Sequence, residues 1–415
     1  MEYENTHYFS LPKTYRKNEV HSGDRGSTKP SLPSSTSSQS DFPKVAVIGG
    51  SLGGLFAAIA LRSVNCDVEV FEKSPANMKG SGAGIVMQME IVNFLKEHNI
   101  VPSQSLSIPA YKRQYLRRDG TIGTEESSMQ LMTSWELLYR VLREIFPAKQ
   151  YHNERKFASF KQKKDHIVAE FGENTNHKLC DLLIGADRVG STVRQQLLPK
   201  VLPCYSGYVA WRGFVRESEL TSKLLDLFSN KFTFFFGPKT HILCYLIPGP
   251  NGELSVGKRR LNWVWYVNVP LHGGDLKKVL TDLNGVEWPF SVPQGMVNGD
   301  IVEKQKNVAE DILPDSFQEL LFATEEPFVQ AIYDLSVSKM AFGHMCLIGD
   351  ASFVVRPHAA ASTSKAAKNA VALSKFIQRH RGDIATALNK WEPSQLAIGN
   401  YVTSLGIRLG NSFQT

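Results

Sequence analysis

Residues 44–72 read KVAVIGGSLGGLFAAIALRSVNCDVEVFE, and this stretch decides the fold. The β-branched run 44–48 predicts a strand, the apolar spacing after the glycines predicts a helix, and residues 67–72 predict a second strand. A strand–turn–helix–strand unit of about thirty residues is the smallest piece of a parallel sheet. The uncharged run 45–61 belongs to this unit, and it is also short for a membrane span.

The turn of this unit has the pattern of a dinucleotide-binding site. Gly49, Ser51 and Gly54 occupy the three glycine positions of the GxGxxG pattern, with a serine at the middle one. The first glycine permits the tight turn, and the last permits close packing of the helix on the sheet. Backbone N–H groups from Leu52 onward can bind a pyrophosphate, and Glu72 has the spacing of a carboxylate that binds a ribose. A tight turn without a ligand is the alternative interpretation.

The rest of the chain predicts an α/β protein in which one lobe is inserted into another. Of the 415 residues, 1–43 lack periodicity and predict a disordered leader. Residues 44–204 and 334–415 predict the two parts of an α/β lobe with a parallel sheet. Residues 205–333 alternate like antiparallel strands and predict an inserted β-rich lobe.

Charge and cysteine content exclude several classes of function. Forty-seven Lys and Arg against 40 Asp and Glu give a net charge of +7, and the basic clusters are not interleaved with aromatics in a nucleic-acid module. The five cysteines include no CxxC pair, which predicts reduced thiols and no metal site. The first residues are polar and charged and show no apolar signal segment. We therefore expect a cytoplasmic protein with neither a nucleic-acid partner nor a membrane.

Two further clusters have a strand that ends in a turn and then a helix start. Residues 183–194 read LIGADRVGSTVR and contain Asp187 and Arg194. Residues 346–363 read CLIGDASFVVRPHAAAST and place Asp350 at the end of a strand. Such an aspartate can bind a sugar hydroxyl, although each cluster alone also fits ordinary turn chemistry.

Together the three clusters resemble those of the group A FAD-dependent aromatic hydroxylases (monooxygenases), and within them the 2,6-dihydroxypyridine 3-hydroxylase-like branch. The resemblance extends from Lys44 to the end of the chain. The motifs that carry it are GGSLGG (49–54), GAGIVMQ (82–88), SWELLYR (134–140), GYVAWRG (207–213), RRLNWVWY (259–266) and GDASFVVRPHAAA (349–361).

The resemblance implies an enzyme that uses FAD, NAD(P)H and O₂ to hydroxylate a small electron-rich aromatic or heteroaromatic substrate through a flavin C4a-hydroperoxide. It also implies that the first lobe is Rossmann-like, of the glutathione-reductase type, and binds FAD, and that the β-rich lobe of residues 205–333 binds the substrate. A homodimer is compatible with it. The cofactor-binding residues that it implies are Gly49, Ser51, Leu52, Gly54, Glu72, Gly84, Gln88, Asp187, Arg194, Asp350, Pro357, His358 and Ala361.

Four residues depart from the family pattern, among them Asn369 in place of an acidic residue and Trp135 in place of an arginine found in many members. Arg188 and Ser362 each stand where the family has glycine. Two alternatives therefore remain: a same-fold oxidase, dehydrogenase or weakened relative, and a nucleotide-binding regulator without catalysis.

The β-rich lobe offers the candidate catalytic residues. A base near the substrate hydroxyl would help ring hydroxylation, and we select His241, Tyr208 and Arg212. Trp211 and Tyr245 are weaker candidates. A satisfied core histidine is the alternative interpretation of His241, and Trp263 and Trp265 alternate like one packed sheet face.

Overall fold

The computed structural model describes residues 42–75, 83–164, 166–172 and 176–414. Residues 42–415 form one compact unit. The leader predicted at 1–43 lies outside the described residues except for its last two positions.

Strands and helices both occur throughout the described part of the chain. The strands are β1 Lys44–Ile48, β2 Asp67–Phe71, β3 Gly84–Val86, β4 Ile108–Leu116, β5 Ile122–Ser134, β6 Tyr151–His152, β7 Phe157–Gln162, β8 Ile167–Phe171, β9 Asn176–Cys180, β10 Leu182–Gly185, β11 Cys204–Arg216, β12 Lys231–Gly237, β13 Thr240–Ile247, β14 Arg260–Asn268, β15 Ser291–Val292, β16 Phe328–Ser336, β17 Ala341–Phe342, β18 Met345–Leu347 and β19 Phe353–Val354. The helices are α1 Leu52–Arg62, α2 Met89–Glu97, α3 Trp135–Ile145, α4 Thr192–Leu197, α5 Ser222–Phe228, α6 Asp275–Val279, α7 Gly299–Ile312, α8 Asp315–Phe322, α9 Ser362–Arg379 and α10 Ile384–Gln414, with short 3₁₀ turns η1 Ser103–Leu106, η2 Ala148–Gln150, η3 Glu217–Glu219, η4 Gly349–Ala351 and η5 Pro357–Ala359.

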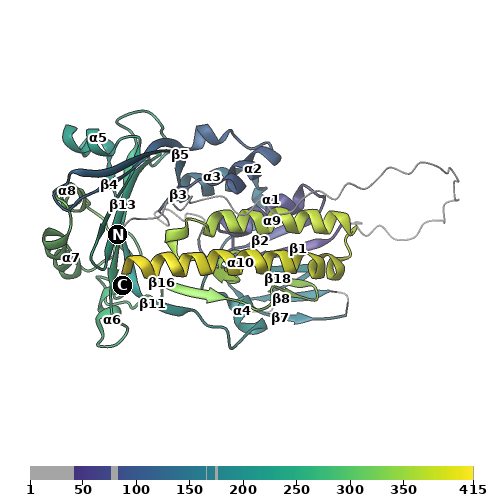
Figure 1. Ribbon diagram of the computed structural model, residues 1–415. Helices are drawn as coiled ribbons and strands as arrows, with labels where there is room; N and C mark the ends of the chain where they lie inside the picture. Colours follow the sequence, from purple (N-terminus) through teal and green to yellow (C-terminus); the bar gives the residue numbers. More distant parts are fainter. Residues whose placement is uncertain (1–41, 76–82, 165, 173–175, 415) are drawn as a thin grey trace, which may run out of the picture. The chain divides into compact units, whose positions relative to one another are not determined.

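The first sheet contains the predicted strand–turn–helix–strand unit. Within the described residues it has six strands in the order β17-β18-β10-β1-β2-β6, all parallel except β17. β1 and β10 are buried along almost their whole length, as expected for strands covered on both faces. Figure 1 shows α9 and α10 running alongside this sheet, and the predicted Rossmann-like lobe is confirmed.

The second sheet is the predicted β-rich layer. Its ten strands, counted over the described residues, follow the order β15-β16-β11-β14-β13-β12-β4-β5-β3, with β19 paired to β16. One face packs against α5, α7 and α8 in a core that includes Trp211, Trp263 and Trp265. The other face carries Tyr208 and Tyr266 and lies toward the first sheet's loops.

Three strands join this second sheet from an unexpected part of the chain. The sequence analysis placed residues 84–134 in the first lobe, whereas β3, β4 and β5 extend the ten-stranded sheet. β4 pairs in parallel with β12, so that Lys112 lies opposite Lys231. Short-range patterns do not reveal a pairing between segments more than a hundred residues apart, which explains the difference. The predicted boundaries at 204 and 333 remain predictions.

Helix α10 packs against elements of both sheets. It runs from beside α9 to the β-rich layer (Figure 1). A Cβ on Gly399 would lie 2.3 Å from the ring of Phe353, and one on Gly410 would lie 2.6 Å from the Tyr208 hydroxyl. Glycine is therefore required where this helix meets the loops that it covers.

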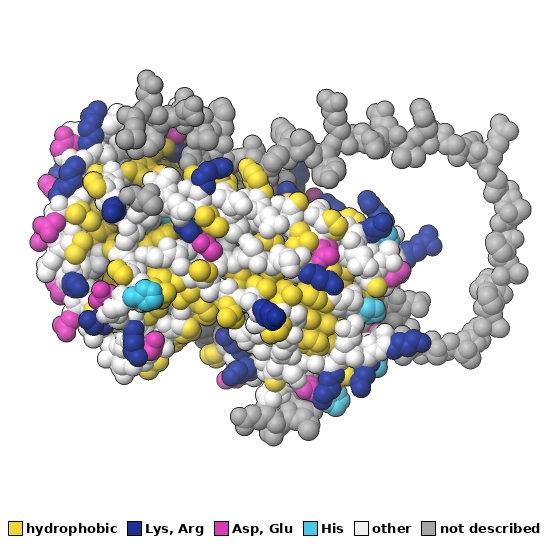
Figure 2. Space-filling view, turned by 60° about the horizontal axis from the view of Figure 1, so that its bottom comes forward, with side chains coloured by type: hydrophobic (Ala, Val, Ile, Leu, Met, Phe, Trp, Pro, Cys, Tyr) yellow, Lys and Arg dark blue, Asp and Glu magenta, His cyan; other side chains and the backbone are white. Residues whose placement is uncertain are grey.

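On the face shown in Figure 2, basic and acidic side chains are interspersed and form no continuous basic band. No helix in the described part of the chain is both long and apolar enough to cross a membrane.

Candidate functional site: the cofactor and substrate residues

The glycine turn between β1 and α1 has the geometry that the motif predicts. Gly49 has a φ of +102°, and a Cβ there would lie 2.4 Å from the carbonyl oxygen of Ala186. A Cβ on Gly54 would lie 1.9 Å from the carbonyl oxygen of Gly49. Ser51 precedes α1 without a capping side-chain hydrogen bond, and no acidic residue stands in the first turn. The positive end of α1 therefore suits an anion.

Glu72 lies at this turn, as predicted from its spacing. It is 4% exposed, and its Oε2 accepts a hydrogen bond of 2.7 Å from the Gly50 N–H. Tyr151 supports the same turn, because its hydroxyl donates to the Gly50 carbonyl at 3.0 Å. Sequence reasoning missed Tyr151, since nothing in the motif predicts which distant side chain covers the turn.

The third cluster brings Asp350 and Gln88 together around one loop. Ser362 Oγ donates to Asp350 Oδ1 at 2.6 Å. Gln88 Nε2 donates to the Ala360 carbonyl at 2.8 Å, and Ala360 has a φ of +46°. The predicted residues Gln88 and Asp350 therefore lie at the loop of residues 357–361, to which the predicted residue Ala361 belongs.

The side chains of the second cluster (residues 183–194) form hydrogen bonds to backbone groups, and one of these bonds joins it to the third cluster. The Asp187 carboxylate accepts hydrogen bonds from Ser191 Oγ and from the Thr192 N–H at 2.7 Å, so it caps α4. Burial is the main cause that raises the pKa of Asp187. Arg194 is fully buried, and its Nη1 donates to the Ala351 carbonyl at 3.2 Å. Arg194 thus ties the second cluster to the third one.

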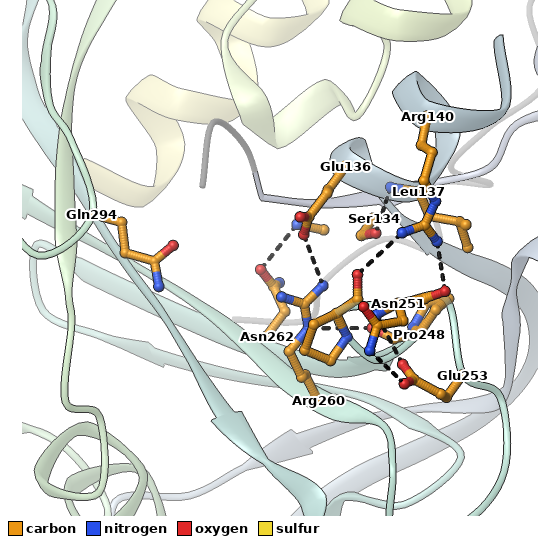
Figure 3. Close-up of polar contacts among 12 residues, drawn as sticks. Ser134, Glu136, Leu137, Arg140, Pro248, Asn251, Glu253, Arg260, Asn262 and Gln294 are labelled. Atoms are coloured by element: carbon orange, nitrogen blue, oxygen red, sulfur yellow. Dashed lines mark hydrogen bonds and ion pairs between the residues drawn. The ribbon is translucent and has the colours of Figure 1, made fainter. Parts of the chain in front are cut away.

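Gly84 lies where the two sheets meet. Its N–H donates to Asn262 Oδ1 at 3.0 Å, and a Cβ would lie 2.7 Å from Tyr245. Figure 3 shows the neighbouring contacts that α3 makes with the loop after β13 and with the start of β14, where Arg260 pairs with Glu136 at 3.5 Å. The Gly84–Asn262 hydrogen bond joins β3 to β14 within the second sheet.

The second sheet presents three rows of side chains to the cofactor loops. The first row is formed by His241, Tyr266 and Ala210, the second by Leu243, Val264 and Arg212, and the third by Tyr245, Asn262 and Phe214. The first row contacts the loop of residues 357–361, since the rings of Tyr266 and His358 are 4.2 Å apart. The third row contacts Gly84. The middle row, which contains Arg212, therefore lies between these two contacts. We call this face of the second sheet, formed by the three rows, the floor of the site.

Arg212 is a buried cation without a counter-charge. It is 8% exposed, and its Nε has no hydrogen-bond partner. Among the residues that the structure describes, no carboxylate lies within ion-pair distance of Arg212. An isolated buried charge is costly, so such a group indicates a place for a negatively charged or strongly accepting ligand.

The other two candidate catalytic residues lie at one end of this floor. Tyr208 Oη is 3.0 Å from His358 Nε2, and burial raises the pKa of Tyr208. His241 is 2% exposed, and neither ring nitrogen has a partner. Burial lowers the pKa of His241 to about 3, and burial is also the main cause that lowers the pKa of His358. Both imidazoles are neutral near pH 7.

Three tryptophans lie on the opposite face of the second sheet. Trp263 and Trp265 form one packed face, as expected, and their indole N–H groups donate to Thr324 and Thr240 at 2.8 Å. Trp211 lies in the same core. It alternates with Arg212 along β11, which sends the two side chains to opposite faces.

Comparison with known proteins identifies the family of this chain. A family model described as FAD binding domain-like matches residues 205–334. A 2,6-dihydroxypyridine 3-monooxygenase from Paenarthrobacter nicotinovorans is 34% identical over 380 residues, which cover 89% of this chain and 93% of that protein. This chain belongs to the FAD-dependent aromatic hydroxylases.

Solved structures of the family have the same fold. The 2,6-dihydroxypyridine-3-hydroxylase of Arthrobacter nicotinovorans superposes with a TM-score of 0.84 at 32% identity, covering 90% of this chain and 93% of that one. Klebsiella pneumoniae HpxO, whose structure contains FAD and uric acid, has a TM-score of 0.73 at 20% identity over 90% of this chain and 89% of its own. The second likeness shows the fold alone.

The residues of this chain fit FAD, the cofactor of the family. Gly49 and Gly54 leave room for the backbone turn that faces a pyrophosphate, and the start of α1 has no competing carboxylate. Glu72 and Asp350 are placed at the carboxyl ends of β2 and β18, where α/β sheets bind their ligands. The chain is thus an FAD-dependent monooxygenase by family and by the form of its site.

The two residues that replace the family's glycines have different physical consequences. Arg188 has a φ of +68°, a conformation that glycine adopts without strain and arginine does not. Ser362 is ordinary helix, and its hydroxyl reaches Asp350. The backbone at Arg188 is therefore strained, whereas Ser362 adds a contact to Asp350, a predicted cofactor residue.

Replacing Arg188 with glycine should stabilise the protein. We expect a gain of about 1 kcal/mol in the free energy of unfolding, because the left-handed backbone no longer carries a Cβ. Thermal unfolding measures the effect. Arg188→Ala is the matched control, since it removes the guanidinium but keeps the Cβ. Equal melting temperatures for the glycine and alanine variants would contradict the explanation.

Proposed function

We propose that this chain hydroxylates a small, electron-rich aromatic or heteroaromatic ring that carries an ionisable hydroxyl, with NADH or NADPH as reductant and O₂ as oxidant. The observation that supports it best is Arg212, a buried guanidinium without a counter-charge in the described structure. It lies between the residues that contact Gly84 and those that contact the loop of residues 357–361.

The cofactor-binding residues divide between the three clusters. Gly49, Ser51, Leu52 and Glu72 bind the adenosine and pyrophosphate half of FAD, and Asp350 binds the ribityl chain. When bound, FAD supplies the capacity to take a hydride from the nicotinamide and to activate O₂. The stretch from Pro357 to Ala361, together with Gly84 and Gln88, would hold the flavin ring.

The floor residues act on the substrate. Arg212 binds the ionised hydroxyl oxygen, and this stabilises the anionic ring, which is the better nucleophile. With a pKa of about 3, His241 is too weak a base to hold a proton at neutral pH, so its role is a neutral hydrogen-bonding partner. The Tyr208–His358 pair orients the same end of the substrate. Burial of this floor excludes water from the reacting ring.

The test is a ligand screen on the purified protein. We expect a yellow protein whose NADH or NADPH oxidation accelerates by about tenfold or more with a hydroxylated ring, and a product that contains one atom from labelled O₂. The methyl ether of the same ring is the matched control, because it cannot ionise.

Each contrary result has a distinct meaning. Flavin reduction without a hydroxylated product supports the same-fold oxidase or dehydrogenase. A folded protein that takes up no FAD supports the non-catalytic regulator. Equal stimulation by the hydroxyl compound and its methyl ether contradicts the role of Arg212.

A further inference from the structure

Lys365 is a buried amine in the first turns of α9 that the reaction does not use. Its side chain is 1% exposed. Its Nζ donates to the Gly349 carbonyl at 3.0 Å and to the Phe353 carbonyl, and it lies 3.7 Å from Asp350 Oδ1. An ammonium group is costly to bury, so these three contacts on one turn require an explanation.

Ser362 reaches the same carboxylate from one helical turn earlier. Its Oγ donates to Asp350 Oδ1 at 2.6 Å. Residues three apart share a helix face, so Ser362 and Lys365 act on the turn η4 from one side. Ser362 is also the position where the family pattern has glycine.

Only one oxygen of Asp350 is engaged in this way. Both contacts go to Oδ1, and within the described part of the chain Oδ2 has neither a hydrogen bond nor an ion pair. The Asp350 side chain is 42% exposed. One oxygen is therefore held by the protein, and the other stays accessible with a fixed direction.

We propose that Ser362 and Lys365 are positioning residues that hold the Asp350 carboxyl group in the orientation that suits the ribityl hydroxyls of FAD. The inference rests on the cofactor role of Asp350 in the proposed function. Lys365 supplies the nearby positive charge and fixes the backbone on both sides of Asp350, while Ser362 fixes the rotamer. The serine at the family's glycine position thus strengthens cofactor binding in this chain.

Equilibrium binding of FAD to the apoprotein tests the proposal without reference to activity. Quenching of flavin fluorescence gives the dissociation constant for wild type, Ser362→Ala and Lys365→Met. We expect that constant to rise about threefold for Ser362→Ala and about tenfold or more for Lys365→Met. Lys368→Met is the matched control, because it removes a lysine of the same helix that has no contact with η4, and it should bind FAD as wild type does.

A double-mutant cycle separates positioning from general damage to the helix. In an Asp350→Ala background, Ser362→Ala should weaken FAD binding much less than it does in wild type, because its hydrogen-bond acceptor is absent. Equal weakening in both backgrounds overturns the proposal.

Two further results also decide the question. Ser362→Ala is expected to fold even if Lys365→Met does not, and wild-type affinity in folded Ser362→Ala overturns the proposal whatever Lys365→Met shows. A wild-type chain that binds no FAD contradicts the proposed function itself, whereas normal wild-type binding with unchanged variants contradicts only the positioning role.

Discussion

Replacing Gly54 with alanine is expected to abolish FAD retention and to lower the melting temperature sharply. The added Cβ would lie 1.9 Å from the Gly49 carbonyl oxygen, which is backbone and has no flexible end to move. The start of α1 must then shift away from β1, at a cost of about 3 kcal/mol or more. This shift also displaces the N–H groups that face the pyrophosphate.

Gly53 supplies the matched control for this prediction. A Cβ there would meet only the Cβ of Ala366, at 3.7 Å, which is ordinary contact. Gly53→Ala should melt at or slightly above the wild-type temperature, because alanine favours a helix by up to about 1 kcal/mol. Thermal unfolding and flavin content measure both variants. If Gly54→Ala kept its flavin and its melting temperature, the close approach would not be what requires glycine.

Replacing Arg212 with methionine is expected to raise the dissociation constant of the hydroxylated substrate by about a hundredfold, with FAD content unchanged. Methionine keeps much of the apolar bulk but removes the only charge on this part of the floor, and a buried charge–ligand contact contributes about 3 kcal/mol. Substrate titration and steady-state kinetics measure the loss.

The free energy of unfolding of Arg212→Met distinguishes a ligand-binding role of Arg212 from a structural one. Because Arg212 has no counter-charge in the described residues, Arg212→Met should leave the free protein equally stable or more stable. Arg216→Met is the control on the same strand, since Arg216 is 69% exposed and pairs with Glu219. A loss of stability in Arg212→Met without a loss of substrate affinity would assign Arg212 to the framework.

The cofactor half of the site was predictable because its residues are neighbours in sequence. Gly49, Gly54 and Glu72 lie within one strand–turn–helix–strand unit, where spacing fixes geometry. Asp350 was found through its place at a strand end and through the family resemblance. The contact from Tyr151 to the turn joins positions about a hundred residues apart, and no local pattern indicates it.

The substrate half was predictable only as a set of candidates. The alternation of residues 207–213 fixes that Tyr208 and Arg212 share a face and that Trp211 takes the other. It does not fix which face meets the cofactor loops, so Trp211 could not be excluded. The pKa of His241 was equally unknown, because it depends on burial by rings from β12, β14 and α10.

The fold class, the glycine turn and the family follow from the amino-acid sequence alone. The fold class depends on short-range periodicity, the turn on the steric requirements of glycine, and the family on the order of the motifs. The tertiary structure decided which groups meet across the chain. It placed β3, β4 and β5 in the second sheet, left Arg212 without a counter-charge, and set Ser362 and Lys365 on Asp350. The physical reason is that burial and charge pairing depend on what packs against a residue, and the packing partners here come from distant segments.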